Sequence, residues 1–241
     1  MIELKSLSCS YSDESILKDV NLSVESHLSI LGANGSGKST LARAICSLIE
    51  YDGEVLADGV NIKNLSYQER AKTVGYIPAK LEIYDSFITV QDFVLLGRFA
   101  YKKSFFEYSS EDRKIADANI KLLGLEHLKN HTLVSLSSGE QQLSLIAAAL
   151  CQESKIIIFD EPTANLDPRN SRVIAKYIKK LKDTHQIILI THDLHLASFI
   201  GSPIAFIKDK NAHFYEDGFF DDEVLKELYG APFCSLAVKY E

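Results

Sequence analysis

Residues 32–40, GANGSGKST, have the types and spacing of a loop that binds phosphate. Gly32 is followed by four residues and then by Gly37-Lys38-Ser39, which is the phosphate-loop pattern. Glycines let the backbone turn its N–H groups inward, and a helix N-terminus behind them adds a field that favours anions. We therefore predict that Lys38 reaches the β- and γ-phosphates of a nucleotide and that the Ser39 hydroxyl ligates Mg²⁺. The other nucleotide-binding residues predicted in this loop are Gly32, Asn34, Gly35, Ser36, Gly37 and Thr40.

The segments on either side of this loop predict the context that the motif requires. HLSILG before it is typical of a buried strand, and LARAICSLI after it is typical of a helix. The alternative is a glycine- and serine-rich turn between unrelated elements. The lysine, the hydroxyl and both flanks favour the phosphate loop instead.

Two adjacent carboxylates, Asp160 and Glu161, end the apolar strand predicted in KIIIFDEP. Neighbouring side chains on a strand point to opposite faces, so the two acids need not share one task. We predict that Asp160 holds Mg²⁺ through water. Pro162 biases Glu161 towards an extended backbone, which would aim its carboxylate at a water beyond the γ-phosphate as a general base. A solvated pair of loop acids is the alternative.

His192 follows the next predicted buried strand, QIILIT. Because strand ends on one edge of a parallel sheet converge on a crevice, this imidazole could hydrogen-bond both the γ-phosphate and Glu161. Taken alone, His192 is more typical of a turn residue. His195 lies three residues further on, but a metal site made by the two histidines would lack an evident third ligand.

A serine-rich loop and an early tyrosine complete the set of candidate binding residues. In LSSGEQQ at 136–142, Ser137, Ser138 and Gly139 offer a hydroxyl-rich helix N-terminus that suits an anion, and simple N-capping is the alternative. Tyr11 lies on or beside the N-terminal sheet, where an aromatic ring could stack on a nucleotide base. The alternative for Tyr11 is an ordinary strand tyrosine.

The hydrophobic patterns predict an α/β fold with two additions to its core. Alternation in residues 2–31 and a hairpin that turns at Asp58-Gly59 predict an N-terminal antiparallel β subdomain. From 85 to 150 the pattern is helical, with one helix fitted to 109–123 because Ser110 precedes EDRKIADANIKLL as its cap and Gly124 follows, and this predicts an inserted helical lobe. We expect a single domain in which 1–84 and 151–241 form the core with the β subdomain, and 85–150 form the helical subdomain.

Composition limits the classes of partner. With 46% hydrophobic and 24% charged residues, the 241-residue chain has the make-up of a soluble globular protein. A net charge of −7 argues against nucleic acid as the main partner. The four cysteines form no CxxC pair, so they predict reduced thiols rather than a zinc or redox site. Because no uncharged apolar run approaches the roughly 20 residues that span a bilayer, we expect any membrane role to come through a partner.

Taken in order, the motifs resemble those of the ATP-binding subunit of ABC transporters along nearly the whole chain. GANGSGKST resembles Walker A, LSSGEQQ the signature, IIIFDEP Walker B, ANLD the D-loop and TH the switch histidine. Tyr11 occupies the place of the family's adenine-stacking aromatic residue. Five motifs in this order are far more specific than any one of them. The resemblance implies a P-loop NTPase core with a parallel sheet flanked by helices.

The resemblance also implies a mechanism. Two copies of the chain would sandwich two ATP molecules, each held by one phosphate loop and capped by Ser137 and Gly139 of the other copy. Asp167 would pass information across the dimer, and Glu161 would polarise the attacking water beside His192. Closing and reopening of this dimer would drive a separate membrane permease. The chain would then be cytoplasmic and held at the inner face of the plasma membrane through that permease.

Two further stretches narrow the expected transport class. TVQDFVLLGR at 89–98 and the later ELYG resemble the subunits of importers for iron chelates, haem and cobalamin. The leading hypothesis is therefore an ATPase that powers a metal-chelate importer. A soluble ATPase of the same family that serves cofactor assembly and a weakly hydrolysing ATP-gated module are the alternatives, and a nucleic-acid-associated ATPase fits least well.

The chain departs from the family pattern at two places. Ala79 stands where the family usually has a glutamine that approaches Mg²⁺ and the attacking water, so we expect slower or less tightly coupled hydrolysis. Ser138 replaces the first glycine of the signature. Because Ser137 and Gly139 are retained, we expect ATP capping to survive.

Overall fold

A six-stranded sheet forms the centre of the protein, in the order β10-β9-β3-β8-β7-β6. The computed structural model describes residues 1–11, 14–102, 107–230 and 240. Five of the strands run parallel, and β10 pairs antiparallel with β9 at one edge. The bounds of these strands are β3 (Leu28–Gly32), β6 (Val74–Ile77), β7 (Ile156–Asp160), β8 (Gln186–Ile190), β9 (Ile204–Lys208) and β10 (Asn211–Tyr215).

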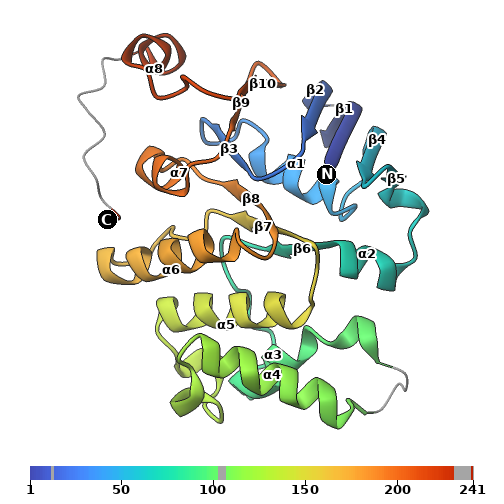
Figure 1. The fold of residues 1–241 in the computed structure, drawn as a ribbon, viewed down its shortest axis with the longest axis vertical. Helices are drawn as coiled ribbons and strands as arrows, with labels where there is room; N and C mark the ends of the chain where they lie inside the picture. Colours follow the sequence, from blue (N-terminus) through green and yellow to red (C-terminus); the bar gives the residue numbers. More distant parts are fainter. Residues whose placement is uncertain (12–13, 103–106, 231–239, 241) are drawn as a thin grey trace.

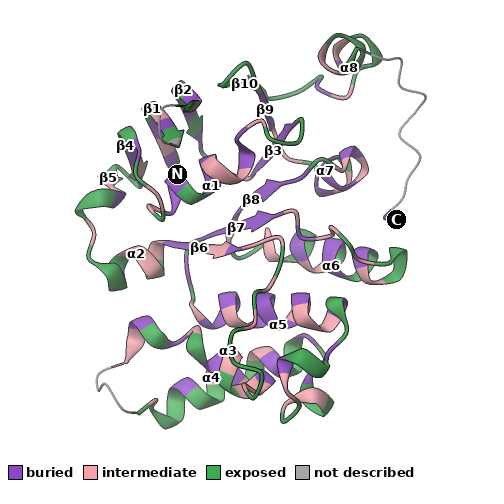
Figure 2. Ribbon diagram, turned by 180° about the vertical axis from the view of Figure 1, so that it is seen from behind, coloured by how far each residue is buried: buried purple, intermediate pink, exposed green. Residues whose placement is uncertain are grey.

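Short, continuous apolar runs become central strands because both faces of this sheet are covered. Every residue of β3 and of β7 is buried, as is typical of parallel strands between two layers. Figure 2 shows buried residues gathered in these strands and along helix α5 (Ser138–Cys151). Alternate residues face opposite layers: Ile156 and Ile158 pack beside helix α1 (Lys38–Ile45), whereas Ile157 and Phe159 pack against the helices of the other face.

The N-terminal part of the chain forms a separate four-stranded antiparallel sheet, in the order β2-β1-β4-β5. Its strands are β1 (Ile2–Tyr11), β2 (Glu14–Val24), β4 (Asp52–Ala57) and β5 (Val60–Asn61). Asp58 and Gly59, with φ of 49° and 79°, make the tight turn between β4 and β5, as predicted. This sheet shares one hydrophobic core with α1 and one face of the central sheet.

The remaining helices lie around these sheets. Figure 1 shows α3, α4 and α5 grouped below the central sheet, with the antiparallel strands on its other side. The bounds are α2 (Tyr67–Thr73), α3 (Val90–Leu96), α4 (Ser110–Leu122), α6 (Pro168–Leu181), α7 (Leu194–Ile200) and α8 (Asp222–Tyr229), and short 3₁₀ helices lie at Ile62–Asn64, Phe99–Tyr101, Glu126–Leu128 and Leu133–Ser135. None of the helices in the described part of the chain is long and apolar enough to cross a membrane.

A buried arginine joins the three helices between β6 and β7. Arg98, 5% exposed, places its Nε 3.0 Å from Asp112 Oδ1 at the start of α4. Its Nη1 donates to the Cys151 carbonyl at 2.8 Å and to Glu153 Oε2 at 2.7 Å, beyond the end of α5. A buried charge is tolerated when it is paired in this way, so Arg98 fixes the helices to one another.

Two helix starts differ from the sequence-based expectation. Ser109, not Ser110, caps α4, because its hydroxyl accepts from Asp112 N while the Asp112 carboxylate bonds back to Ser109 N. Helix α5 begins at Ser138, inside the serine-rich stretch that was expected to be a loop. Reciprocal capping of this kind satisfies the free N–H groups of a first turn, which extends a helix towards its N-terminus.

Candidate active site

The predicted site residues lie at the ends of three neighbouring strands, at one edge of the central sheet. β3 ends at Gly32, β7 at Asp160 and β8 at Ile190, and β8 lies between the other two. Because all three strands are parallel, the loops that follow them leave from the same edge. The phosphate loop, Glu161 and His192 are thereby brought together.

The loop between β3 and α1 has an open, donor-rich geometry. Gly35 and Gly37 have φ of 79° and 101°, values that favour glycine, and the Gly37 N-cap of α1 has no side-chain hydrogen bond. A Cβ on Gly32 would come within 2.7 Å of the Ile207 carbonyl oxygen, so only glycine fits there. The Ser36 hydroxyl is buried and has no hydrogen-bond partner among the described residues. An uncapped helix start beside an unsatisfied hydroxyl fits a phosphate group. Of the other predicted loop residues, Asn34 and Gly35 are exposed and Thr40 is half-buried.

Lys38 lies folded against this loop. Its Nζ donates to the Gly32 and Ala33 carbonyl oxygens, at 2.9 Å each, and the residue is only 6% exposed. Burial lowers the pKa of Lys38, whereas the negative charges of Glu161 and Asp160 oppose that shift. The ammonium group is therefore held within the loop, close enough to Glu161 and Asp160 for their charges to act on it.

Asp160 joins the phosphate loop to the neighbouring strand β6. It follows Ile158 by two positions and so emerges on the face that α1 covers, where Ser39 Oγ donates to its Oδ1 at 3.1 Å. The Tyr76 phenol donates to its Oδ2 at 2.7 Å. The Ser39 hydroxyl and the Asp160 carboxylate are hard oxygen ligands, and Mg²⁺ is typically bound by one or two carboxylates, waters and substrate phosphates. These residues therefore fit Mg²⁺.

Glu161 has a different backbone from the one that the following proline favours. The extended conformation expected before Pro162 is wrong, since Glu161 adopts a left-handed φ of 48°. Its N–H donates to Ile190 O at 2.8 Å, and its carbonyl accepts from Ala164 N at 3.0 Å, so the chain reverses at the strand end. These contacts outweigh the local bias. Such strain costs about 1–3 kcal/mol and is frequent at functional sites.

The Glu161 carboxylate meets His192 across the strand ends. Oε2 of Glu161 lies 2.9 Å from His192 Nδ1 and 3.4 Å from His192 N. Thr191 Oγ1 donates to the same oxygen at 3.4 Å. The Glu161 side chain is 17% exposed and that of His192 57%, so the pair opens towards solvent. Within the described ranges, no group of three or more His, Cys, Asp or Glu side chains is arranged to hold a metal ion.

Ser137, Gly139 and Asp167 lie apart from the phosphate loop and make other contacts within the chain. Ser137 caps α5: its N–H and Oγ donate to Glu140 Oε2 at 2.8 and 2.6 Å. A Cβ on Gly139 would come within 2.6 Å of the Asn170 side chain. Asp167 caps α6, accepting from Arg169 N and Asn170 N at 2.9 and 3.0 Å. The N-capping alternative for Ser137 therefore describes its contacts in one copy of the chain.

Three tyrosines remain to be described: one that was predicted to bind the nucleotide and two that the sequence analysis did not single out. The Tyr11 side chain lies outside the described residues, and only its backbone, at the end of β1, is placed. Tyr76 was missed because a tyrosine in a strand carries no signal of its partner. Tyr240 was also missed: it is 1% exposed, and its phenol donates at 2.7 Å to Asp193 Oδ2, next to His192.

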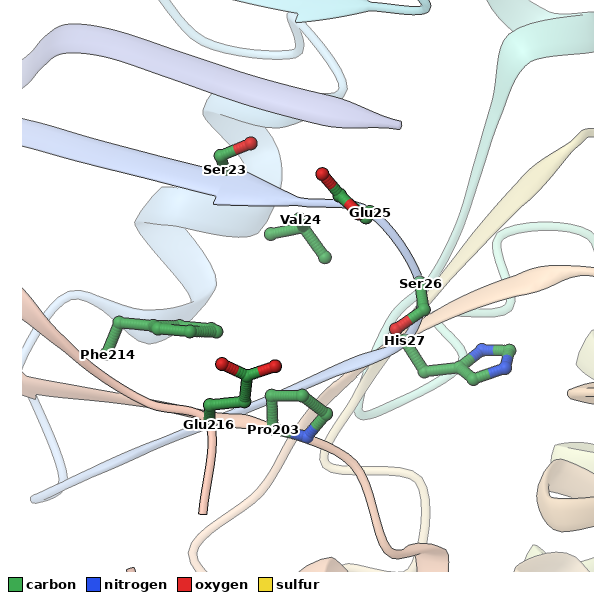
Figure 3. A pocket seen from close by; sticks show the side chains of 8 residues that line it. All are labelled: Ser23, Val24, Glu25, Ser26, His27, Pro203, Phe214 and Glu216. Carbon is green, nitrogen blue, oxygen red and sulfur yellow. The ribbon is translucent and has the colours of Figure 1, made fainter.

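A separate cavity of about 350 Å³ lies where β3 and β9 begin, at the opposite edge of the sheet from these strand ends. Figure 3 shows the Phe214 and Glu216 side chains on one side of this cavity, Val24 and Glu25 on the other, and the His27 ring turned away from them. His27 Nδ1 accepts from Ile187 N at 3.2 Å, and burial lowers its pKa. The histidine therefore supports the sheet. The cavity is lined by Ser23, Val24, Glu25, Ser26, His27, Pro203, Phe214 and Glu216.

Comparison with known sequences gives a family match and named relatives. Residues 17–164 match the family model described as ABC transporter. The chain is 38% identical to an uncharacterized ABC transporter ATP-binding protein of Methanocaldococcus jannaschii, covering 91% of this chain and 87% of the relative. It is 33% identical to the "Probable siderophore transport system ATP-binding protein" of Bacillus subtilis, over 88% of this chain and 78% of that protein. A "Probable iron chelatin transport ATP-binding protein" of Helicobacter pylori is 34% identical, with coverage of 87% and 84%.

Solved structures share the same architecture. A transporter described as of the metal-chelate type, in an inward-facing conformation, aligns with a TM-score of 0.82 at 26% identity, covering 96% of this chain and 89% of the other. A dimeric bacterial ABC transporter cassette aligns with a TM-score of 0.78 at 32% identity, covering 91% and 100%. A second dimeric structure of that same cassette, in a post-hydrolysis state bound to ADP and phosphate, aligns with a TM-score of 0.76 at 31% identity, covering 91% and 100%.

Proposed function

This chain belongs to the ABC transporter family of ATP-binding proteins and is an ATPase coupled to transport. From that premise, we propose that it powers the import of a metal chelate through a separate membrane permease. The names of the siderophore and iron chelatin relatives support this substrate class, as does the solved transporter described as of the metal-chelate type. The stretch TVQDFVLLGR at 89–98 points the same way. Iron-siderophore, haem and cobalamin cargoes are the members of the class that the sequence resembles.

The observation that carries the catalytic proposal is the meeting of Glu161 and His192 beside Lys38 and Asp160. Glu161 accepts a proton from the attacking water through its carboxylate, which His192 holds in place by the 2.9 Å contact between Nδ1 and Oε2. Lys38 binds the β- and γ-phosphates of ATP. Ser39 and Asp160 hold Mg²⁺, which when bound neutralises charge on the phosphate oxygens.

We place a second copy of the chain opposite this site. Ser137 and Gly139 stand at the start of α5, away from the phosphate loop of their own chain, so they are available to cap ATP bound by another copy. Asp167, in the D-loop, caps α6 and accepts a hydrogen bond from Asn170, whose side chain packs on Gly139. The D-loop is thereby linked to Ser137 and Gly139 at the start of α5. The dimeric cassette at 32% identity supports this arrangement.

The subdomains of the chain and its place in the cell are part of the same proposal. We propose that residues 85–150 form the helical subdomain, and that 1–84 and 151–241 form the core with its antiparallel sheet. The protein would be cytoplasmic and peripheral, held at the inner face of the plasma membrane by the permease. In that state each chain presents its helices to the permease and its strand ends to the other copy.

Copurification tests the importer assignment. The tagged full-length chain is expressed in its own host, membranes are solubilised in a mild detergent, and proteins retained with the chain are identified. We expect a polytopic permease, and we expect phosphate release by the chain to rise when that permease is reconstituted with it. Recovery of the chain with soluble cofactor-assembly proteins and with no polytopic membrane protein would contradict the importer proposal, while leaving the ATPase assignment intact.

Ala79→Gln is expected to raise ATP turnover about 2- to 10-fold, because the added amide would supply one neutral hydrogen bond to the attacking water, and such a bond is worth about that factor. Ala79 lines a cavity of about 310 Å³ with Gln142, whose buried Nε2 has no hydrogen-bond partner among the described residues. A glutamine at 79 has room there, and its carbonyl can accept from that amide. Phosphate release is measured for the chain alone and with the permease.

Ala79→Leu is the matched control for this change, because it fills the same cavity without an amide. We expect leucine to leave turnover at the wild-type level or below it. If Ala79→Gln changes neither basal nor permease-stimulated turnover, the idea that Ala79 slows or uncouples hydrolysis is wrong.

A further inference from the structure

Tyr76 lies outside the three strand ends of the active site but on the same face of the sheet. It sits on β6, directly opposite Ile158 in the parallel pairing of β6 with β7. Ile158 and Asp160 are two positions apart, so their side chains share the face that α1 covers. Two residues of strand span about 6.6 Å, a distance that a tyrosine side chain can bridge. The register of β6 therefore places the Tyr76 phenol at the Asp160 carboxylate.

Both oxygens of Asp160 are held, each by a different element. Tyr76 Oη donates to Oδ2 at 2.7 Å, and Ser39 Oγ donates to Oδ1 at 3.1 Å. Two donors on separate oxygens fix the rotation of the carboxylate as well as its position. An ionised carboxylate has about four acceptor sites, so two remain for other ligands. Asp160 is only 3% exposed, so bulk water cannot replace either donor.

The phenol is itself held in place on the α1 side. Arg43, on α1, makes a side-chain hydrogen bond with the Tyr76 hydroxyl. A guanidinium can only donate, so the phenol accepts from Arg43 and keeps its own proton for Asp160. The chain Arg43–Tyr76–Asp160 thus runs from the helix behind the phosphate loop, across the edge strand, to the predicted metal ligand. A side chain that only filled space in the core would not require this pattern of donors and acceptors.

We propose that Tyr76 is a positioning residue that sets the affinity of the site for Mg²⁺ by holding the Asp160 carboxylate in its metal-binding orientation. The inference rests on the proposed function, since it takes Asp160 and Ser39 as the Mg²⁺ site. Partners that orient a metal ligand typically change metal affinity by 10- to 100-fold when they are removed. Tyr76 acts through Asp160 and does not touch the nucleotide.

Tyr76→Phe removes the phenol oxygen and keeps the ring. Binding of a fluorescent, non-hydrolysable ATP analogue to the full-length chain is titrated against Mg²⁺, and separately without Mg²⁺ in excess chelator. We expect the Mg²⁺ concentration for half-maximal binding to rise about 10- to 100-fold, with magnesium-free affinity changed less than about 2-fold. A purely structural role would weaken both measurements together and lower the thermal midpoint.

Tyr177→Phe is the matched control, because it also removes a phenol that donates to a partner, the Leu122 carbonyl at 3.2 Å, far from the strand ends. We expect it to keep the wild-type Mg²⁺ dependence. When Tyr76→Phe is combined with Asp160→Asn, it should change the Mg²⁺ concentration for half-maximal binding by less than about 2-fold relative to Asp160→Asn alone, because its effect passes through Asp160.

The outcomes separate the two proposals. Wild-type Mg²⁺ dependence in Tyr76→Phe, or equal losses with and without Mg²⁺, overturns the positioning role while the wild-type protein still binds Mg²⁺ and nucleotide as proposed. If the wild-type chain itself shows no Mg²⁺-dependent nucleotide binding, the proposed metal site fails, and the role of Tyr76 fails with it.

Discussion

Glu161→Gln should hydrolyse ATP about 10²- to 10⁴-fold more slowly than the wild-type protein while still binding ATP. Glutamine has almost the same shape and can still accept a hydrogen bond from His192, but it cannot take the proton of the attacking water. We expect the variant to keep the left-handed backbone at this position and the contact with His192, because the two side chains have nearly the same shape. Only the chemical step is therefore lost.

Three measurements distinguish this outcome from a general loss of function. Phosphate release reports the chemical step, a fluorescent ATP analogue reports binding, and size-exclusion chromatography with ATP reports the dimer, which we expect to accumulate because it cannot reopen by hydrolysis. Glu223→Gln is the control, since it makes the same substitution at an exposed position on α8. Normal turnover in Glu161→Gln would remove the assignment of this residue as the base.

Lys38→Ala has the second large expected effect, a loss of ATP affinity of about 10²-fold or more. A hydrogen bond to a charged group contributes about 1.5–3 kcal/mol, and Lys38 is expected to contact two phosphates. Its present partners, the Gly32 and Ala33 carbonyl oxygens at 2.9 Å, show that the ammonium group already lies in the loop. Because the residue is only 6% exposed, its charge is poorly screened by water.

Affinity is measured by titrating a fluorescent ATP analogue into each variant. Lys176→Ala serves as the control, because it removes an exposed lysine of α6 without touching the phosphate loop. We expect the control to bind ATP like the wild-type protein. An unchanged affinity in Lys38→Ala would show that the loop does not bind phosphate through this lysine.

Much of the fold could be predicted because its signals are local. The fully buried runs in β3 and β7, the turn at Asp58-Gly59 and the amphipathic pattern of α6 follow from the side chains of neighbouring residues. The phosphate loop could be predicted for the same reason, since glycine spacing, lysine and hydroxyl all lie within nine residues, 32–40. The start of α4 was misplaced by one residue because Ser109 and Ser110 are equally good caps by type, and only the observed hydrogen bonds distinguish them.

The backbone of Glu161 shows where local reasoning stops. The sequence offered only Pro162, which favours an extended residue before it. The observed left-handed conformation depends on Ile190, which lies on the neighbouring strand β8 and accepts the Glu161 N–H at 2.8 Å. No pattern within a few residues of Glu161 carries that information.

The amino-acid sequence by itself determined which groups are available for chemistry and in which local settings: a glycine loop with Lys38 and Ser39, two acids at a strand end, and a histidine after another strand. The tertiary structure alone decided which strands are neighbours, and so that Tyr76 meets Asp160 across 84 positions of chain and that His192 meets Glu161 across 31. The physical reason is that strand order and register arise from the packing of the whole sheet, in which hydrogen bonds and buried surface are shared by segments far apart in the chain.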